Sequence, residues 1–241
     1  MNKPIEETKS RNLSEIEKEC IIEGEFDQRF AIALAKAAIE EIANIYGPAF
    51  TRLASEYALE FEAKMLNEKP PENIKGLNAV TNYIIANLNR YPRGQCSMVY
   101  GLNKAESKLQ GFSSSGARRG AYKAMKVMFE KTGLLNKLIG TTENAYEALK
   151  MLPVKEMRQV TRYHYIRGEG KNEVTAIYSN CPAKDGCKAL FNEGISKMLG
   201  GLHCILLNCG LAAIEIITKK SFDYVLEEFD EPDCKGRIFE V

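Results

Sequence analysis

The stretch QVTRYHYIRGEGKNEVTAIYSNC, residues 159–181, decides the fold class of this chain. Two runs rich in aromatic and β-branched residues flank the turn-like GEGKN, residues 168–172, and this pattern is typical of a β-hairpin. The sequence before the hairpin has a helical pattern, whereas the sequence after it mixes helical and strand patterns. The hairpin therefore marks the point at which a helical region passes into a domain that contains a sheet.

On the N-terminal side, apolar residues at helical spacing predict helices over 27–47, 48–66, 73–91, 113–133 and 141–153. The segment 95–112 alternates poorly, and we expect it to supply one or two short strands. Residues 1–24 are highly charged and have no clear apolar face. They are expected to form a loosely held arm or a short surface helix.

On the C-terminal side, two helices are predicted over 185–201 and 202–220. A closing strand pair is predicted over 221–230 and 237–241, around a turn that carries Cys234. The order indicates an α+β protein, in which an N-terminal helical region precedes a β-β-α-α-β-β domain with an antiparallel sheet. The expected divisions are a charged arm (1–24), a mainly helical region (25–155) and the sheet domain (156–241).

The composition excludes some classes of partner. Lys and Arg number 33 against 32 Asp and Glu, a net charge of +1, so no general attraction to nucleic acid or to a membrane is expected. No run reaches the roughly 20 apolar residues of a membrane span, and the N-terminus has no apolar signal core. With seven cysteines and no sign of export, the sequence indicates a reducing, cytoplasmic location.

Cysteines are the most informative residues of the last quarter of the chain. The chain has seven cysteines, of which Cys20 and Cys96 stand alone in sequence and are interpreted as buried core residues without a chemical role. Five gather near the C-terminus: Cys181, Cys187, Cys204, Cys209 and Cys234. In a reducing compartment such a cluster more often binds metal or performs chemistry than forms bridges.

The spacing of these cysteines limits how they could bind a metal. Cys204 and Cys209 point about 140° apart on a regular helix, so we do not expect both to hold one ion. One of them could instead meet Cys234 across the fold. Glu227, which precedes Cys234 together with Glu228 and Asp230, could complete a tetrahedral zinc site. Taken alone, the residues leave a zinc site and a set of buried thiols equally open.

Two segments resemble the 4-vinyl reductase domain family, a set of small-molecule-binding domains. They are CILLNCGLAAIEIIT, residues 204–218, and FDYVLEEFDEPDCKGRIFEV, residues 222–241. The resemblance implies zinc, with Cys204 as the helix ligand, Cys209 as an alternative register and Cys234 as the hairpin ligand. The family's cysteine several residues before the last one is missing here. Glu227 or Asp230 substitutes for it, or Cys181 or Cys187 reaches in, or the metal is lost.

Candidate ligand-binding residues lie outside the cysteine cluster. In the resembling family the core between helices and sheet opens into a hydrophobic pocket, and Tyr163, Tyr165 and Tyr178 of the hairpin would form one wall of it. The segment GFSSSGARRG, residues 111–120, places Arg118 and Arg119 near a helix start, where they could bind a carboxylate. A capped helix with solvated arginines is the alternative interpretation.

The resulting expectation is a zinc-stabilised cytoplasmic domain that binds a hydrophobic or aromatic small molecule. A homodimer through the apolar N-terminal helices is also expected. The rival interpretation is an enzyme with a reactive cysteine, which would be a hydrolase of a small cyclic substrate, or an accessory protein of tetrapyrrole reduction. An iron–sulfur cluster is a third use of the same cysteines.

Overall fold

A computed structural model describes residues 19–22, 28–109, 115–131, 133–152, 162–170, 172–179, 181, 183–195, 204–229 and 233–241. Its strands are β1 (Glu19–Ile22), β2 (Arg162–Arg167), β3 (Val174–Ser179), β4 (Phe222–Phe229) and β5 (Asp233–Glu240). Its helices are α2 (Gln28–Tyr46), α3 (Pro48–Met65), α4 (Leu77–Ala86), α5 (Gln95–Lys108), α6 (Ser115–Lys131), α7 (Leu135–Leu138), α8 (Ala145–Lys150), α10 (Lys184–Asn192) and α12 (Ile205–Thr218).

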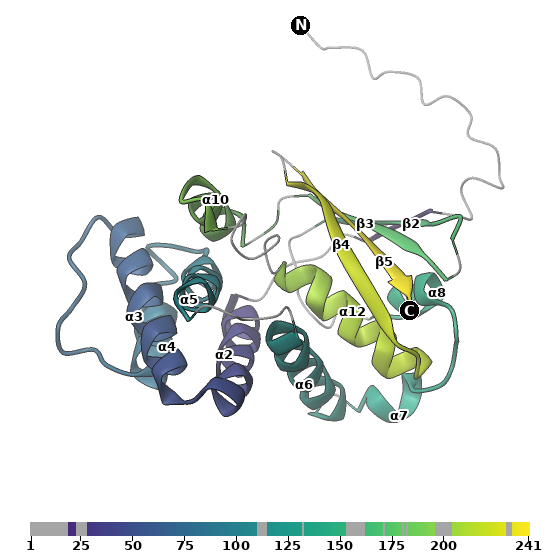
Figure 1. The fold of residues 1–241 in the computed structure, drawn as a ribbon, viewed down its shortest axis with the longest axis horizontal. Coiled ribbons are helices and arrows are strands. Elements are labelled where there is room, and N and C mark those ends of the chain that lie inside the picture. The colour runs from purple at the N-terminus through teal and green to yellow at the C-terminus, as the bar shows by residue number, and fades with distance from the viewer. Residues whose placement is uncertain are drawn as a thin grey trace, which may run out of the picture.

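The five strands form one antiparallel sheet in the order β1-β2-β3-β5-β4, which confirms the α+β class. Figure 1 shows α2 to α5 grouped at one end of the molecule and the sheet at the other, with α12 lying against it. Alternate residues of the central strands are buried on the face that carries α12, among them Ala176, Tyr178, Cys234 and Ile238. The other face of the sheet is only partly covered by the described residues.

Helix α12 lies close to the sheet because β5 has a glycine beneath it. A Cβ atom at Gly236 would lie 2.4 Å from the Leu207 Cδ1 atom, so a side chain there would force the Leu207 side chain to move. Gly236 pairs with Ala176 on β3 and with Leu226 on β4, on the strand next to the edge of the sheet. This contact fixes the first turns of α12 over β5 and thereby positions the cysteines at that end of the helix.

The helical end of the molecule is held by similarly close contacts. A Cβ atom at Gly101 on α5 would lie 2.3 Å from the Ala54 carbonyl oxygen of α3. Nearby, the Ser97 hydroxyl donates a hydrogen bond of 2.6 Å to the buried Glu62 carboxylate. Helices α6 to α8 share a hydrophobic core with the sheet and α12, so the core around the sheet extends well before residue 156.

Three local expectations were wrong. Segment 95–112 supplies helix α5 and no strand among its described residues; α5 is buried on nearly every side, so it lacks the one-sided apolar pattern that identifies most helices. Strand β1 lies inside the segment expected to be an arm, and it extends the sheet beside β2. Cys234 lies within β5, which begins at Asp233, and not in the preceding turn.

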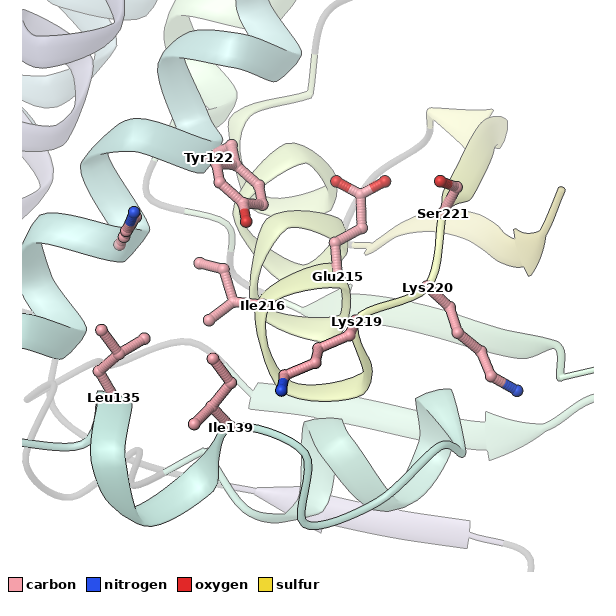
Figure 2. A pocket seen from close by; sticks show the side chains of 9 residues that line it. Tyr122, Leu135, Ile139, Glu215, Ile216, Lys219, Lys220 and Ser221 are labelled. Carbon is pink, nitrogen blue, oxygen red and sulfur yellow. The ribbon is translucent and has the colours of Figure 1, made fainter.

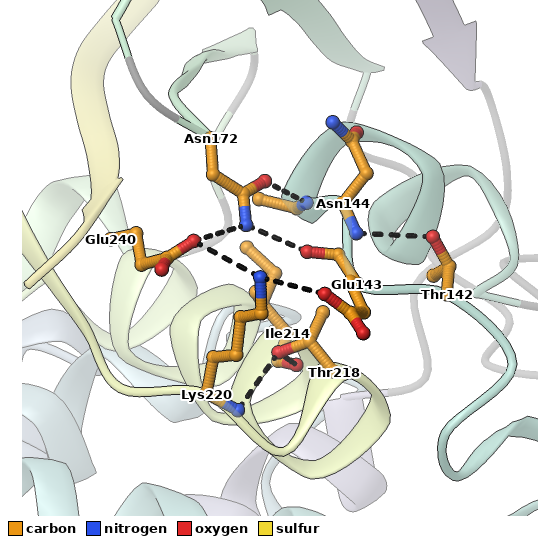
Figure 3. Close-up of polar contacts among 9 residues, drawn as sticks. Thr142, Glu143, Asn144, Asn172, Ile214, Thr218, Lys220 and Glu240 are labelled. Atoms are coloured by element: carbon orange, nitrogen blue, oxygen red, sulfur yellow. Dashed lines mark hydrogen bonds and ion pairs between the residues drawn. The ribbon is translucent and has the colours of Figure 1, made fainter.

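A polar network joins the hairpin to the rest of the domain (Figure 3). The Asn172 side chain accepts a 2.6 Å hydrogen bond from the Ala145 backbone N–H at the start of α8. Its amide nitrogen donates to the Glu143 carbonyl oxygen at 2.7 Å and to the Glu240 carboxylate at 2.9 Å. Asn172 adopts a φ of 52°, a left-handed conformation that asparagine tolerates better than most residues. One side chain thus links the β2–β3 turn, α8 and the end of β5.

Candidate functional site

Four cysteines from separate segments lie in one region of the fold near the start of α12. Cys181 follows β3, and Cys187 lies in α10. Cys204 is the N-cap residue of α12, and Cys234 lies on β5. Cys204 is partly exposed and the other three are buried, and all four are free thiols. We call these four residues the thiol cluster.

The pKa values of the thiols show that they share one environment. Burial raises the pKa of Cys181 well above its ordinary value, and the thiols of Cys204 and Cys234 raise it further. Burial likewise raises the pKa of Cys187, with added contributions from the other three. Because the repulsion between two thiolates weakens with distance, these mutual effects place the four sulfurs in one region of the fold.

Cys204 occupies a distinctive electrostatic position at the start of α12. Burial raises its pKa to about 11, and the nearby Cys234 thiol adds to the increase. The backbone N–H groups of Leu206 and Leu207 lie near its sulfur and partly oppose that increase in pKa. Free N–H groups at a helix start stabilise negative charge. Cys204 therefore lies at a helix start whose N–H groups favour a thiolate, and the backbone of Ala183 has the same kind of effect on Cys181.

Cys96 borders the same cluster, although the sequence indicated an isolated residue. Its sulfur accepts hydrogen bonds from the backbone of Gly186 and Asp185 at the start of α10. A Cβ atom at Gly186 would lie 2.5 Å from the Cys96 carbonyl oxygen, so α10 and α5 are in backbone contact here. Burial raises the pKa of Cys96 to about 11, and this thiol contributes to the raised pKa of Cys181. No sequence signal links positions 96 and 181, because only the packing of α10 on α5 joins them.

The four thiols are ligands of a kind that zinc prefers, but they are not arranged to coordinate an ion in this structure. Four thiols from four segments are the kind of ligands that a structural zinc site uses. Among the residues that the structure describes, no three His, Cys, Asp or Glu side chains form a group that could hold a metal ion. His203 and Asp230, the neighbours of the cluster in sequence, lie outside the described residues. The chemistry of the cluster therefore fits a zinc ion, and ligation would require the thiols to draw closer together.

The other two expected metal ligands have different surroundings. Burial raises the pKa of Cys209 to about 12, with a further contribution from Cys204, which lies nearer the start of the same helix. The Glu227 carboxylate accepts a 2.8 Å hydrogen bond from Arg237 and forms a 3.4 Å ion pair with Lys235. Both basic residues lie on β5 at positions that alternate with the buried ones, so Glu227 is engaged on the sheet face opposite α12.

Arg118 and Arg119 have different roles although they are adjacent in α6. The Arg118 guanidinium donates to the Phe222 carbonyl oxygen and, at 3.2 Å, to the Asp223 carboxylate. It also lies 3.7 Å from the Glu215 carboxylate. Arg118 thus ties α6 to the start of β4, whereas Arg119 is exposed and lines a shallow surface hollow.

Two of the hairpin tyrosines, Tyr165 and Tyr178, lie on the sheet face that packs against the helices. Tyr165 is 3% exposed and Tyr178 is 1% exposed, and both belong to the main hydrophobic core. Tyr163 is the cross-strand partner of Tyr178, and its side chain lies outside the described part of the structure. The two described tyrosines therefore serve as core residues in this conformation.

A groove near the C-terminal end of α12 is a second candidate site (Figure 2). It has a volume of about 480 Å³, within the usual range of small-molecule pockets. We call it the α6–α12 groove. Its lining residues come from α6, the α7 region and the end of α12: Tyr122, Lys126, Leu135, Ile139, Glu215, Ile216, Lys219, Lys220 and Ser221. The sequence contained no signal for it, because these residues are separated by up to about a hundred positions.

Comparison with protein family models, curated proteins and solved structures found no match to this chain. Among the described residues, no helix is long and apolar enough to cross a membrane.

Proposed function

We propose that this chain is a cytoplasmic small-molecule-binding protein whose thiol cluster holds a zinc ion. The observation that carries the proposal is the convergence of Cys181, Cys187, Cys204 and Cys234 from four separate segments. The resemblance of residues 204–218 and 222–241 to 4-vinyl reductase domains supports the same interpretation. In this proposal Cys181 and Cys187 supply the ligands that the missing family cysteine would have provided.

The bound zinc would act structurally. Zinc stabilises the thiolate form of its ligands, so its binding offsets the burial that now raises the thiol pKa values. Cys204 begins α12 and Cys234 lies on β5, so a shared ion would fasten the final hairpin to the helix. Cys181 and Cys187 would add the end of β3 and α10 to the same attachment. The protein would then lose stability when zinc is removed.

The ligand in this proposal is a hydrophobic or aromatic small molecule. The α6–α12 groove supports this part, because Leu135, Ile139 and Ile216 give it an apolar floor. Ile139 is 40% exposed and Tyr122 is 39% exposed, so both present apolar surface to the groove. A bound apolar molecule would cover both residues.

The electrostatics favour a binding protein over an enzyme with a nucleophilic cysteine. A reactive cysteine needs a depressed pKa so that its thiolate is present at neutral pH. Within the described chain, every resolved shift of a cysteine pKa is upward, and burial is the first cause in each case. No feature of the described residues favours the hydrolase or the tetrapyrrole-reduction role.

Metal content tests the zinc proposal directly. Protein purified without a histidine tag or chelators should contain one zinc per chain by inductively coupled plasma mass spectrometry. Cys234→Ser and Cys187→Ser should each lose most of this zinc, whereas Cys209→Ser, on the same helix as Cys204, should retain it. Native protein without stoichiometric metal, or equal retention in all three variants, would refute the proposal.

A homodimer remains part of the proposal. The N-terminal helices bury most of their apolar side chains in a core of their own, but Ile45 on α2 is 41% exposed and Met65 on α3 is 39% exposed. These two residues are the natural place to look for a contact between copies. Light scattering at micromolar concentration should give twice the mass of the 27.0 kDa chain, and a monomer would dispose of the dimer.

A further inference from the structure

The charges of the α6–α12 groove are not balanced. Among the described residues, Lys126 on α6 and Lys219 at the end of α12 take part in no ion pair or side-chain hydrogen bond, and both line the groove. Lys220 is already engaged, since its ammonium group lies 3.0 Å from Glu143 and 3.5 Å from Glu240 (Figure 3). The groove therefore holds two positive charges that nothing in the described protein neutralises.

The acidic residue of the groove does not supply the missing counter-charge. The Glu215 carboxylate accepts a 3.0 Å hydrogen bond from the Phe222 backbone N–H and lies 3.7 Å from the Arg118 guanidinium. In Figure 2 its carboxylate points away from Lys219 and towards the start of β4. Glu215 is thus committed to the contact between α6, α12 and β4.

A neighbouring hollow has more of its charges paired. It shares Tyr122 and Glu215 with the groove and continues along α6 towards Arg119. There the Lys123 ammonium lies 2.5 Å from the Glu41 carboxylate, and Arg118 is paired with Asp223. Among the described residues, two of the three basic residues of this hollow are therefore paired and Arg119 is not, whereas in the α6–α12 groove only Lys220 of its three basic residues is paired.

Polar and apolar groups are arranged around one space in the groove. Figure 2 shows the Tyr122 hydroxyl directed towards Ile216, with Leu135 and Ile139 below and the Lys219 ammonium beside Ile139. The apolar side chains form a floor for a hydrophobic body, and the lysines and the hydroxyl group supply donors for one end of it. An apolar molecule without a charge would leave both ammonium groups without a partner.

We propose that the α6–α12 groove binds a small apolar molecule that carries one anionic head group, a carboxylate or a phosphate. Lys126 and Lys219 contact the head group, Tyr122 donates a hydrogen bond to it, and Leu135, Ile139 and Ile216 contact the apolar body. The inference rests on the proposed small-molecule-binding function and names the class of ligand. It is independent of zinc, because the thiol cluster lies at the opposite end of α12.

Three naphthalene compounds with different head groups test the inference by calorimetric titration of the full chain. Naphthalene-2-carboxylate and 2-naphthyl phosphate carry an anionic head, whereas naphthalene-2-carboxamide is a neutral match in shape. The double variant Lys126→Gln/Lys219→Asn removes both charges. Asparagine suits position 219 because Lys219 has a φ of 57°, which asparagine tolerates. Lys137→Gln removes an exposed lysine of α7 that does not line the groove and serves as the control.

Both anions should bind at least about tenfold more tightly than the amide, and the double variant should abolish this difference. Lys137→Gln should bind all three compounds as the wild type does, and circular dichroism should show that both variants are folded. Binding of the amide as tightly as the anions, or a preference for the anions that survives in the double variant, would refute recognition of the anionic head group by the two lysines. Either result would leave small-molecule binding by the groove intact. If none of the three compounds binds, this inference and the small-molecule-binding part of the proposed function are both overturned, whereas the zinc site is unaffected.

Discussion

Cys234 on β5 is paired directly with Tyr178 on β3, and both side chains are buried on the sheet face that carries α12. This register aims the Cys234 thiol at the first turn of the helix, where Cys204 is the N-cap residue. A shift of one residue would turn the thiol to the opposite face. The thiol cluster therefore depends on strand register as well as on the choice of cysteine.

Alkylation of Cys204 distinguishes a structural thiol from a catalytic one. Because burial raises its pKa from 9.0 to about 11, the folded, chelator-treated protein should hold about a hundredfold less thiolate at neutral pH than an ordinary cysteine. Iodoacetamide should therefore modify Cys204 much more slowly in the folded protein than in urea, as measured by peptide mass spectrometry. Fast modification of folded protein at pH 7.5 would instead support the reactive-cysteine enzyme.

Arg118 and Arg119 form a matched pair for testing how α6 is attached to the sheet. Arg118→Gln removes the contacts with Phe222 and Asp223 and should lower the free energy of unfolding by about 1–2 kcal/mol. Arg119→Gln changes an exposed neighbour and should alter it by less than about 0.5 kcal/mol. Urea denaturation followed by circular dichroism measures both values. Equal effects would show that Arg118 has no special structural role.

The buried carboxyl of Glu62 should make stability depend on pH. Burial raises its pKa from 4.5 to about 7, although the hydrogen bond from Ser97 partly opposes this. The folded protein therefore binds the proton more tightly than the unfolded chain does. As the pH rises from about 4.5 to above 7, this group should cost up to about 3 kcal/mol of stability.

Glu62→Gln isolates that contribution, because glutamine resembles the protonated carboxyl group. Relative to wild type, the variant should be markedly more stable at pH 8 and nearly equal at pH 5. Glu60 lies two residues before Glu62 on α3 and is exposed. The control variant Glu60→Gln should therefore show no such pH-dependent gain in stability. If Glu62→Gln is less stable than wild type at pH 8, the fold stabilises the ionised carboxylate. The predicted loss of stability with rising pH would then be wrong.

Asn172 allows backbone conformation and hydrogen bonding to be separated. Asn172→Gly keeps the left-handed φ accessible but removes the bonds to Ala145, Glu143 and Glu240, and should cost about 1–3 kcal/mol. Asn67→Gly is the control, because Asn67 is exposed and also left-handed, with a φ of 58°. Thermal unfolding should show a lower Tm only for Asn172→Gly. Similar Tm values for both would mean that the network in Figure 3 contributes little.

Patterns within one element predicted most of the fold. The hairpin at 162–179, the helices around it and the closing strand pair all have one-sided or alternating patterns that match their burial. Helix α5 was not predicted because other elements surround it. Polar and small residues such as Ser97, Gly101 and Asn103 are buried there together with apolar ones, so no one-sided apolar pattern is visible in the sequence. Strand β1 escaped because it is short and depends on pairing with β2.

The site was predictable only where the chain itself carried a chemical signal. Clustered cysteines indicated that either Cys204 or Cys209 could meet Cys234, and the contribution of Cys234 to the raised pKa of Cys204 favours Cys204. The participation of Cys96 depends on how α10 packs on α5, and the pairing of Glu227 with Arg237 depends on a β-bulge next to Leu226. No sequence motif marks Lys126 and Lys219, because they come together in one groove only through the packing of α6 against α12.

X-ray absorption at the zinc edge of the purified native protein tests the central claim most directly. The proposal predicts a first shell of four sulfur atoms at about 2.3 Å, and one sulfur fewer around the small amount of zinc that Cys234→Ser retains. A shell made only of nitrogen and oxygen atoms, or a protein that binds no zinc after reconstitution, would contradict it.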